Sequence, residues 1–453
     1  MNATWADEAF FYHIYPLGLC GAPRRNDFGA PPVPRLERLY PWLDQIQSLG
    51  ATAIYLGPLF ESTAHGYDTA DYYHVDRRLG DRAVLANFAR EVHRRGLRLV
   101  LDGVFNHVGR DFWAFRDVQA NRQGSAFCGW FQGLDFSRSS PAGDPFWYEG
   151  WSGHYDLVKL NLAHPEVRAH LFEAVRMWVE EFEIDGLRLD AADQLSSEFQ
   201  QALATHCRSL HSDFWLLGEM VHGDYRHLAN PAMLDSTTNY ELYKSLYSSH
   251  VDGNYFELAY ALNRQFGPGG IYRGLSLYNF ADNHDVDRVA SSLKNQAHLY
   301  PLYCLLFTVP GIPSIYYGSE WGLSGRRSTY SDAALRPALE LSQAASAPQP
   351  NLAWDIARLA ELRRRTPALR QGDYTQLHVS AEQFAFYRRH LAGSVVVAVN
   401  AGSSPAALDL DLPFSANRLE DLLNPGDVFP VVNGRVHLDP LTPGWARVLA
   451  LRN

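Results

Sequence analysis

Cysteine is scarce in this chain, and the signals of a secreted or membrane-spanning protein are missing. The four cysteines among 453 residues, Cys20, Cys128, Cys207 and Cys304, lie far apart and form no C-x-x-C pair. This spacing indicates neither a zinc site nor a dense disulfide framework. No run approaches the roughly 18 apolar residues of a membrane span, and the N-terminus lacks a basic start and an apolar signal region. We therefore expect a cytoplasmic protein; a chain that has lost a signal peptide would show the same features.

Positively charged residues are fewer than negatively charged ones. The chain has 40 Lys and Arg against 50 Asp and Glu, which gives a formal net charge of −10. Nucleic acid and anionic membrane surfaces would repel such a protein, so we expect neither as a partner. With 46% hydrophobic and 20% charged residues, the composition is typical of a globular protein with a large core.

Strand-like and helix-like segments alternate through most of the chain. Helical spacing of apolar residues predicts helices near 36–49, 83–95, 165–182 and 197–210. The apolar segments that read as strands cover 10–17, 51–59, 97–107, 183–192, 214–220, 233–240, 277–285 and 311–320. Eight strand–helix units in one pattern predict an α/β fold, a closed parallel (β/α)8 TIM barrel with reactive groups at the C-terminal ends of its strands.

Two segments depart from this alternation. Residues 110–163 are rich in Gly, Ser, Trp and Phe and carry no long periodic run, so we expect a subdomain inserted after the third strand that forms a lid or wall. Residues 372–453 consist of short β-like runs and turns, which predict a C-terminal antiparallel β-sandwich domain. The catalytic barrel would then comprise 1–109 and 164–371.

Carboxylates end four of the predicted strands. Asp102, Asp190, Glu219 and Asp285 each follow an apolar run. Arg188 shares a strand face with Asp190, and a guanidinium there favours the ionised carboxylate that a nucleophile needs. Alone, such a pair is more often a buried ion pair than a catalytic site. A parallel barrel, however, gathers the four carboxylates at one end, which favours catalysis.

These strand ends resemble the motifs of the α-amylase superfamily of retaining glycoside hydrolases. The matching stretches stand in the family's order: Asp102-Gly-Val-Phe-Asn-His107, Gly186-Leu-Arg-Leu-Asp190, Leu217-Gly-Glu219, Asn283-His-Asp285 and Gly311-Ile-Pro-Ser-Ile-Tyr-Tyr-Gly318. Several ordered motifs over nearly the whole chain are highly specific, so coincidence is not a serious competitor.

The inserted segment narrows the resemblance to one subgroup. Residues 115–131 and 160–168 are similar to the matching parts of cyclomaltodextrinases and neopullulanases. Two departures stand out. Those enzymes usually carry an N-terminal β domain that is absent here, and they usually have Trp-His after the acid where this chain has Val221-His222.

The resemblance implies a role for each matched residue. Asp190 corresponds to the nucleophile, Glu219 to the general acid/base and Asp285 to the third carboxylate, which stabilises the transition state. The expected substrate-binding residues are Tyr67, Asp68, His107, Arg188, His222, His284 and Arg288. A lone His or Tyr is usually a core or surface residue, but a place in matched motifs favours function.

The resemblance also bears on metal binding. Many α-amylases hold calcium with the Asn of the first motif and a His four residues after the nucleophile. Asn106 is present, but the second position is Gln194. Calcium prefers six to eight oxygen ligands, so one or two make a weak site. We therefore expect no cofactor and activity that survives chelation.

The resulting functional prediction is a retaining α-glucoside hydrolase that acts on short linear or cyclic α-glucan oligosaccharides, such as maltodextrins and cyclodextrins, through a covalent glycosyl-enzyme intermediate. A transglycosylase or glucosyl isomerase with the same site remains an alternative, because acceptor choice depends on how the pocket excludes water. A non-catalytic, amylase-like binding protein is a weaker alternative, because none of the carboxylates is missing. Linkage preference stays open, as does the choice between monomer and homodimer.

Overall fold

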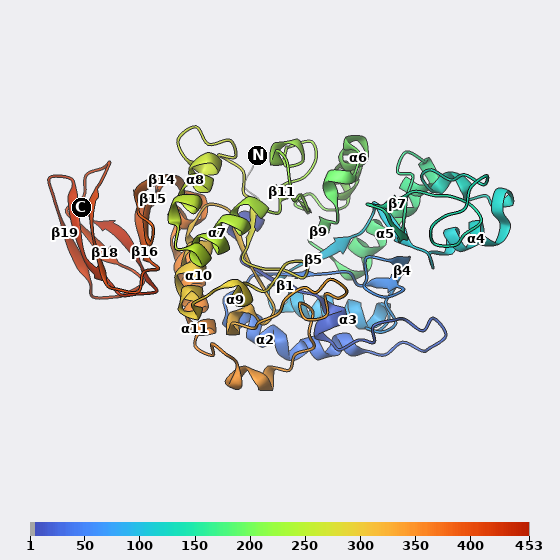
Figure 1. Ribbon diagram of the computed structural model, residues 1–453, viewed down its shortest axis with the longest axis horizontal. Coiled ribbons are helices and arrows are strands. Elements are labelled where there is room, and N and C mark those ends of the chain that lie inside the picture. Colours follow the sequence, from blue (N-terminus) through green and yellow to red (C-terminus); the bar gives the residue numbers. More distant parts are fainter. Residues whose placement is uncertain (1–4, 453) are drawn as a thin grey trace.

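The computed structural model describes residues 5–452, and a parallel eight-stranded sheet forms its centre (Figure 1). Its strands are β1 (Phe11–Ile14), β2 (Ala53–Leu56), β5 (Arg98–Gly103), β9 (Gly186–Leu189), β10 (Trp215–Gly218), β11 (Ser236–Thr237), β12 (Tyr278–Phe280) and β13 (Ile312–Tyr316). Their order is β11-β10-β9-β5-β2-β1-β13-β12. A parallel bridge between Thr238 and Tyr278 joins the two edge strands. The predicted (β/α)8 barrel is thus confirmed.

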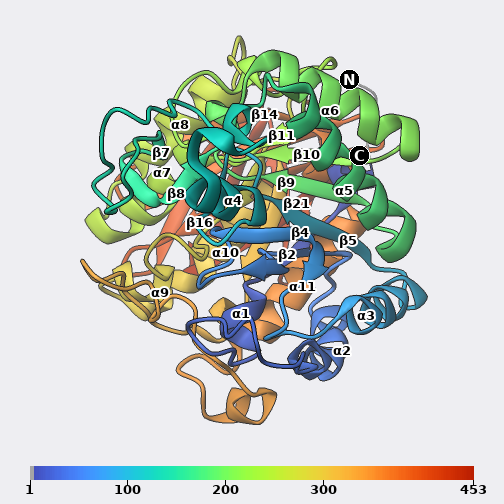
Figure 2. The same ribbon diagram turned by 90° about the vertical axis from the view of Figure 1, so that its right-hand side faces the viewer.

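Helices surround this sheet and cover its outer face (Figure 2). They include α2 (Tyr40–Ser48), α3 (Arg82–Arg94), α5 (Pro165–Phe182), α6 (Ser197–Leu210), α7 (Tyr240–Asp252), α8 (Tyr255–Phe266), α10 (Leu299–Thr308) and α11 (Leu352–Arg365). The apolar stripe predicted for α5 is buried, and its Trp178 stacks on Phe60 at 4.0 Å between ring centroids. The helix predicted from residue 36 starts at Tyr40 because Pro41 favours the first helical turn; a 3-10 turn (Arg35–Leu39) precedes it. Among residues 5–452, no helix is long and apolar enough to cross a membrane.

The inserted segment stands apart from the barrel, at the right of Figure 1. Its sheet has the order β6 (His107–Gly109), β8 (His154–Lys159) and β7 (Gly150–Trp151). One helix, α4 (Trp113–Asn121), lies within it although no long helical run was expected there. The turn between β7 and β8 has two positive φ angles, 49° at Ser152 and 83° at Gly153, as a tight two-residue hairpin requires. This hairpin presents Trp151 toward the barrel, where its ring lies 5.4 Å from that of His107.

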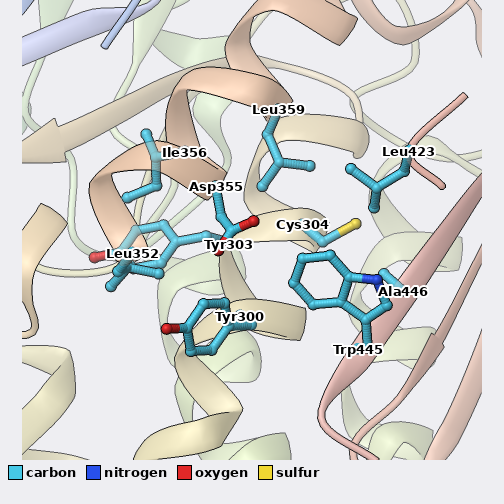
Figure 3. A pocket seen from close by; sticks show the side chains of 10 residues that line it. All are labelled: Tyr300, Tyr303, Cys304, Leu352, Asp355, Ile356, Leu359, Leu423, Trp445 and Ala446. Carbon is cyan, nitrogen blue, oxygen red and sulfur yellow. The ribbon is translucent and has the colours of Figure 1, made fainter. Parts of the chain in front are cut away.

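A second sheet, antiparallel, forms the C-terminal part of the chain at the left of Figure 1. It consists of β14 (Asp373–Val379), β15 (Gln383–His390), β16 (Gly393–Asn400), β17 (Ala406–Asp411), β18 (Arg418–Asp421), β19 (Val428–Val432), β20 (Arg435–Leu441) and β21 (Trp445–Arg452). Figure 3 shows where α10 and α11 pack against Leu423 and Trp445 of this part. The cavity there is no larger than about one water molecule, so this seam is packed core.

Candidate active site

Arg188 of β9 is the centre of the site at the C-terminal ends of the strands. Its Nη1 donates to Asp102 Oδ1 and to Asp190 Oδ1, both at 2.9 Å, and its Nη2 lies 2.9 Å from Glu219 Oε2. Only 3% of Arg188 is exposed. One guanidinium therefore holds three carboxylates from three strands. The fixed, planar set of donors of a guanidinium suits this arrangement.

Close packing of the strands fixes the position of Arg188. A side chain at Gly186, which begins β9, would come within 2.5 Å of the carbonyl oxygen of Trp215 on β10. A glycine is therefore required for the two strands to approach. Asp102, which also binds Arg188, accepts hydrogen bonds from the hydroxyls of Tyr55 at 2.7 Å and Tyr67 at 3.0 Å.

Asp190, directly after β9, uses only one carboxylate oxygen to bind Arg188. Oδ1 is bound by Arg188, whereas Oδ2 lies 3.9 Å from His107 Nε2. Burial raises the pKa of Asp190 well above its usual value, and the charges of Glu219 and Asp102 add to this rise. Arg188 lowers the pKa of Asp190, as the sequence suggested, but it does not outweigh burial.

Glu219, directly after β10, points back toward Asp190. Its Oε2 accepts the backbone N–H of Ala191 at 3.1 Å, and its Oε1 accepts the hydroxyl of Tyr240 at 3.2 Å. Ala191 has a φ of 45°, in the left-handed region that costs a non-glycine residue about 1 kcal/mol or more. The backbone is therefore strained where it aims a donor at Glu219, next to the expected nucleophile.

Asp285 follows β12 and is held from both sides. Arg336 Nη2 donates to Oδ1 at 2.9 Å, and His284 Nε2 lies 2.9 Å from Oδ2. Burial would raise the pKa of Asp285, but His284 and Arg336 outweigh it and hold the pKa well below its usual range. Asp285 is thus a fixed negative charge at the mouth of the site.

Three aromatic side chains, Tyr67, His284 and His107, lie next to these carboxylates. Tyr67 and His284 stack with ring centroids 5.4 Å apart and also form a hydrogen bond through the tyrosine hydroxyl. His107 is buried beside Asp190, and burial lowers its pKa to about 3, so its imidazole is neutral at ordinary pH. These groups suit contacts with an uncharged, hydroxyl-rich ligand.

The structure shows the surroundings of three further residues that the sequence predicts to bind substrate. Asp68 accepts the backbone N–H groups of His65 and Gly66, so its carboxylate shapes the loop that carries Tyr67. His222 is exposed on the loop after Glu219.

Arg288 is fully buried and does not reach the site. It donates to the carbonyl oxygens of Tyr317 and Leu335 and lies over the Tyr316 ring at 4.2 Å. Its contacts are those of a core residue and differ from the sugar contact expected.

Asn106 and Gln194, the positions where the resemblance would place calcium ligands, differ in their surroundings. Asn106 is buried, with its amide 3.2 Å from His107 Nδ1, whereas Gln194 is exposed. Within residues 5–452, no group of three or more His, Cys, Asp or Glu side chains could hold a metal ion. The donor set is thus poor for a hard cation.

Sequence reasoning missed several residues that shape the site. Tyr240 begins α7, and Arg336 lies in the irregular loop after β13, where no periodic pattern marks a side-chain direction. Asp102 was recognised as a strand end but not as the partner of Arg188. Trp151 had no signal beyond its place in an aromatic-rich insertion.

The chain is similar to known proteins over most of its length. Residues 36–385 match the family model described as "Alpha amylase, catalytic domain". A cyclomaltodextrinase from Bacillus sp. is 30% identical over 420 residues, which cover 88% of this chain and 73% of that protein. Neopullulanase 2 from Thermoactinomyces vulgaris is 30% identical, with 91% of this chain and 73% of that protein covered.

Solved structures of related enzymes match nearly the whole of this chain. The ligand-free cyclic α-maltosyl-(1→6)-maltose hydrolase from Arthrobacter globiformis superimposes with a TM-score of 0.82 at 28% identity and covers 100% of both chains. A cyclomaltodextrinase structure gives a TM-score of 0.86 at 26% identity and covers 98% of this chain and 78% of that chain. The chain therefore belongs to the α-amylase family of glycoside hydrolases, and it is similar to cyclomaltodextrinases and neopullulanases.

Proposed function

We propose that the protein is a retaining α-glucoside hydrolase that cleaves short linear or cyclic α-glucan oligosaccharides. The observation that carries this proposal is the sharing of one guanidinium by Asp190 and Glu219, each 2.9 Å from a nitrogen of Arg188. A retaining enzyme needs its two carboxyl groups about 5 to 5.5 Å apart, without room for a water molecule between the nucleophile and the sugar. A common guanidinium supports such a short separation.

In the first half of the reaction, Asp190 Oδ2 attacks the anomeric carbon, because Oδ1 is engaged by Arg188. Glu219 gives its proton to the leaving glycosidic oxygen as the bond to the anomeric carbon breaks. Asp285, held negative by Arg336 and His284, stabilises the positive charge that develops on the sugar ring.

In the second half, Glu219 takes a proton from water. The resulting hydroxide equivalent attacks the anomeric carbon and releases Asp190 as a carboxylate. Two displacements at one carbon return the α-configuration. The Ala191 N–H and the Tyr240 hydroxyl stabilise Glu219 when it is ionised between the two steps.

The preference for short substrates rests on the leaving-group side of the cleft. Val221, 41% exposed after Glu219, offers little area on which a glucosyl unit could stack. Relatives named for cyclodextrins and for a cyclic maltosyl-maltose support the same substrate class. We expect kcat/KM for maltotriose, panose and cyclodextrins to exceed that for soluble starch per cleavable bond. Initial rates across these substrates test the proposal, and a clear preference for starch would refute it.

A further inference from the structure

A tyrosine at the start of α7 lies between the ends of two barrel strands. Tyr240 directly follows Asn239, whose side chain caps α7. The Tyr240 ring packs edge-on against Phe280 of β12, with ring centroids 5.0 Å apart. Its hydroxyl is 3.2 Å from Glu219 Oε1, after β10, and 3.3 Å from Asn283 Nδ2, after β12. The helix cap and the ring contact therefore hold this hydroxyl between the two side chains.

The backbone after β12 fixes the direction of the Asn283 side chain. Asn283 Oδ1 accepts the N–H groups of Asp285 at 2.8 Å and Val286 at 3.1 Å. The NH2 group of the same amide donates to the Tyr240 oxygen. Turning the amide over would remove the acceptor of both N–H groups, and only 9% of Asn283 is exposed to water. The amide is therefore a fixed donor toward Tyr240.

The direction of Asn283 in turn sets the direction of the Tyr240 proton. The Tyr240 oxygen accepts from Asn283, and among residues 5–452 Glu219 Oε1 is the one acceptor to which its hydroxyl donates. Burial, with the charges of Glu219 and Asp285, raises the pKa of Tyr240 well above its usual value, so the hydroxyl keeps its proton. A directed chain of donors thus runs from Asn283 through Tyr240 to Glu219.

The two carboxyl oxygens of Glu219 have different surroundings. Oε2 accepts the N–H of Ala191 at 3.1 Å and lies 2.9 Å from Arg188 Nη2, whereas Oε1 accepts from Tyr240. A proton on Oε2 would face two donors, one of them charged. Oε1 is therefore the oxygen that carries the proton when Glu219 is in its acid form, and Tyr240 binds this oxygen.

We propose that Tyr240 is a positioning residue for the general acid and acts in the step in which Glu219 gives up its proton. This inference rests on the function proposed above. As the proton passes from Oε1 to the leaving glycosidic oxygen, Oε1 becomes negative, and the hydrogen bond from Tyr240 becomes charge-assisted and stronger. Because this bond strengthens toward the transition state, it lowers the barrier to cleavage, and Tyr240 acts through Glu219.

Two substrates whose leaving groups differ in basicity test this role. The leaving oxygen of maltotriose needs a proton, whereas the phenolate of 4-nitrophenyl α-maltoside leaves without one. Tyr240→Phe should lower kcat/KM for maltotriose about tenfold, the difference between a charge-assisted and a neutral hydrogen bond. For the aryl substrate the decrease should stay below about twofold, because no proton transfer is needed. Loss of packing alone would lower both rates by the same factor.

Tyr243→Phe is the matched control. It removes a tyrosine hydroxyl from the same helix, and its ring lies 6.0 Å from that of Tyr240, but the hydroxyl that binds Glu219 remains. Both values of kcat/KM should therefore equal those of the wild type. Glu219→Ala is the reference for complete loss of the acid, and it should lower the rate for maltotriose far more than the rate for the aryl substrate.

The outcomes separate this role from the proposed function. If Glu219→Ala shows the difference between the substrates, Tyr240→Phe overturns the role of Tyr240 by lowering both rates equally, by lowering neither, or by lowering the aryl rate more. If Glu219→Ala shows no such difference, or the wild type cleaves neither substrate, the proposed function fails and this inference fails with it.

Discussion

Replacing Asp102 with Asn should move the acidic limb of the pH–rate profile to lower pH. Asp102 lies on the far side of Arg188 from the proposed nucleophile, and its negative charge is one of the causes that raise the pKa of Asp190. The amide of Asn has nearly the same shape, and its oxygen can still accept from Tyr55 and Tyr67; its NH2 group replaces the oxygen that accepts from Arg188, so the change removes the charge and one hydrogen bond. Asp190 must be ionised to attack, so activity is lost as pH falls through its pKa.

The size of the shift follows from the geometry around Arg188. Asp102 Oδ1 and Asp190 Oδ1 are each 2.9 Å from the same nitrogen. They are therefore separated by at most roughly 6 Å, where two unit charges interact by about 3 kcal/mol at an effective dielectric constant of about 20. That energy corresponds to about two pH units. A measured decrease of one to two units in the apparent pKa of the acidic limb would agree with the electrostatics.

The assay is kcat/KM for maltotriose as a function of pH for the wild type, Asp102→Asn and the control Tyr55→Phe. Tyr55→Phe removes a hydrogen bond to Asp102 without changing a charge, so its limb should move much less. A loss of rate at all pH values does not affect the test, because the limb is read from the shape of the profile. An unchanged limb in Asp102→Asn, or a shift to higher pH, would refute this reasoning.

Three further outcomes follow from the same geometry. Asp190→Asn, Glu219→Gln and Asp285→Asn should each lower kcat by several orders of magnitude with unchanged circular dichroism, and near-wild-type turnover in any of them would remove that residue from the mechanism. Activity should survive EDTA, because Asn106 and the exposed Gln194 offer too few oxygen ligands for a tight calcium site; a loss that calcium restores would contradict this. Arg288→Met should lower the free energy of unfolding in urea by about 2–4 kcal/mol, since the buried carbonyl of Tyr317 loses the donor Arg288 and that of Leu335 keeps only the Tyr316 hydroxyl, and should leave KM for maltotriose unchanged. A large rise in KM at unchanged stability would instead give Arg288 a role in substrate binding.

The strand-end carboxylates could be located from sequence because the barrel imposes their position. Apolar runs that end in Asp190, Glu219 and Asp285 predict strands, and parallel strands in a barrel end on one face. The structure brings all three around the Arg188 side of that face. Their catalytic roles remain predictions until the substitutions are measured.

Side-chain direction in loops could not be predicted in the same way. Arg288 stands three residues after Asp285, yet its side chain turns into the core, whereas Arg336, 51 residues away, binds that carboxylate. The loop between β13 and α11 has no repeating pattern from which this contact could be read. The raised pKa of Asp190 was equally invisible, because it depends on how completely the folded chain excludes water.

The central claim, double displacement at one anomeric carbon, is tested most directly by the configuration of the first product. Proton NMR during early hydrolysis of maltotriose or a cyclodextrin distinguishes the α- and β-anomers before mutarotation mixes them. Nucleophilic attack by Asp190 followed by water predicts that the α-anomer forms first and decays toward equilibrium. Initial release of the β-anomer would show a single displacement and would contradict the roles proposed for Asp190 and Glu219.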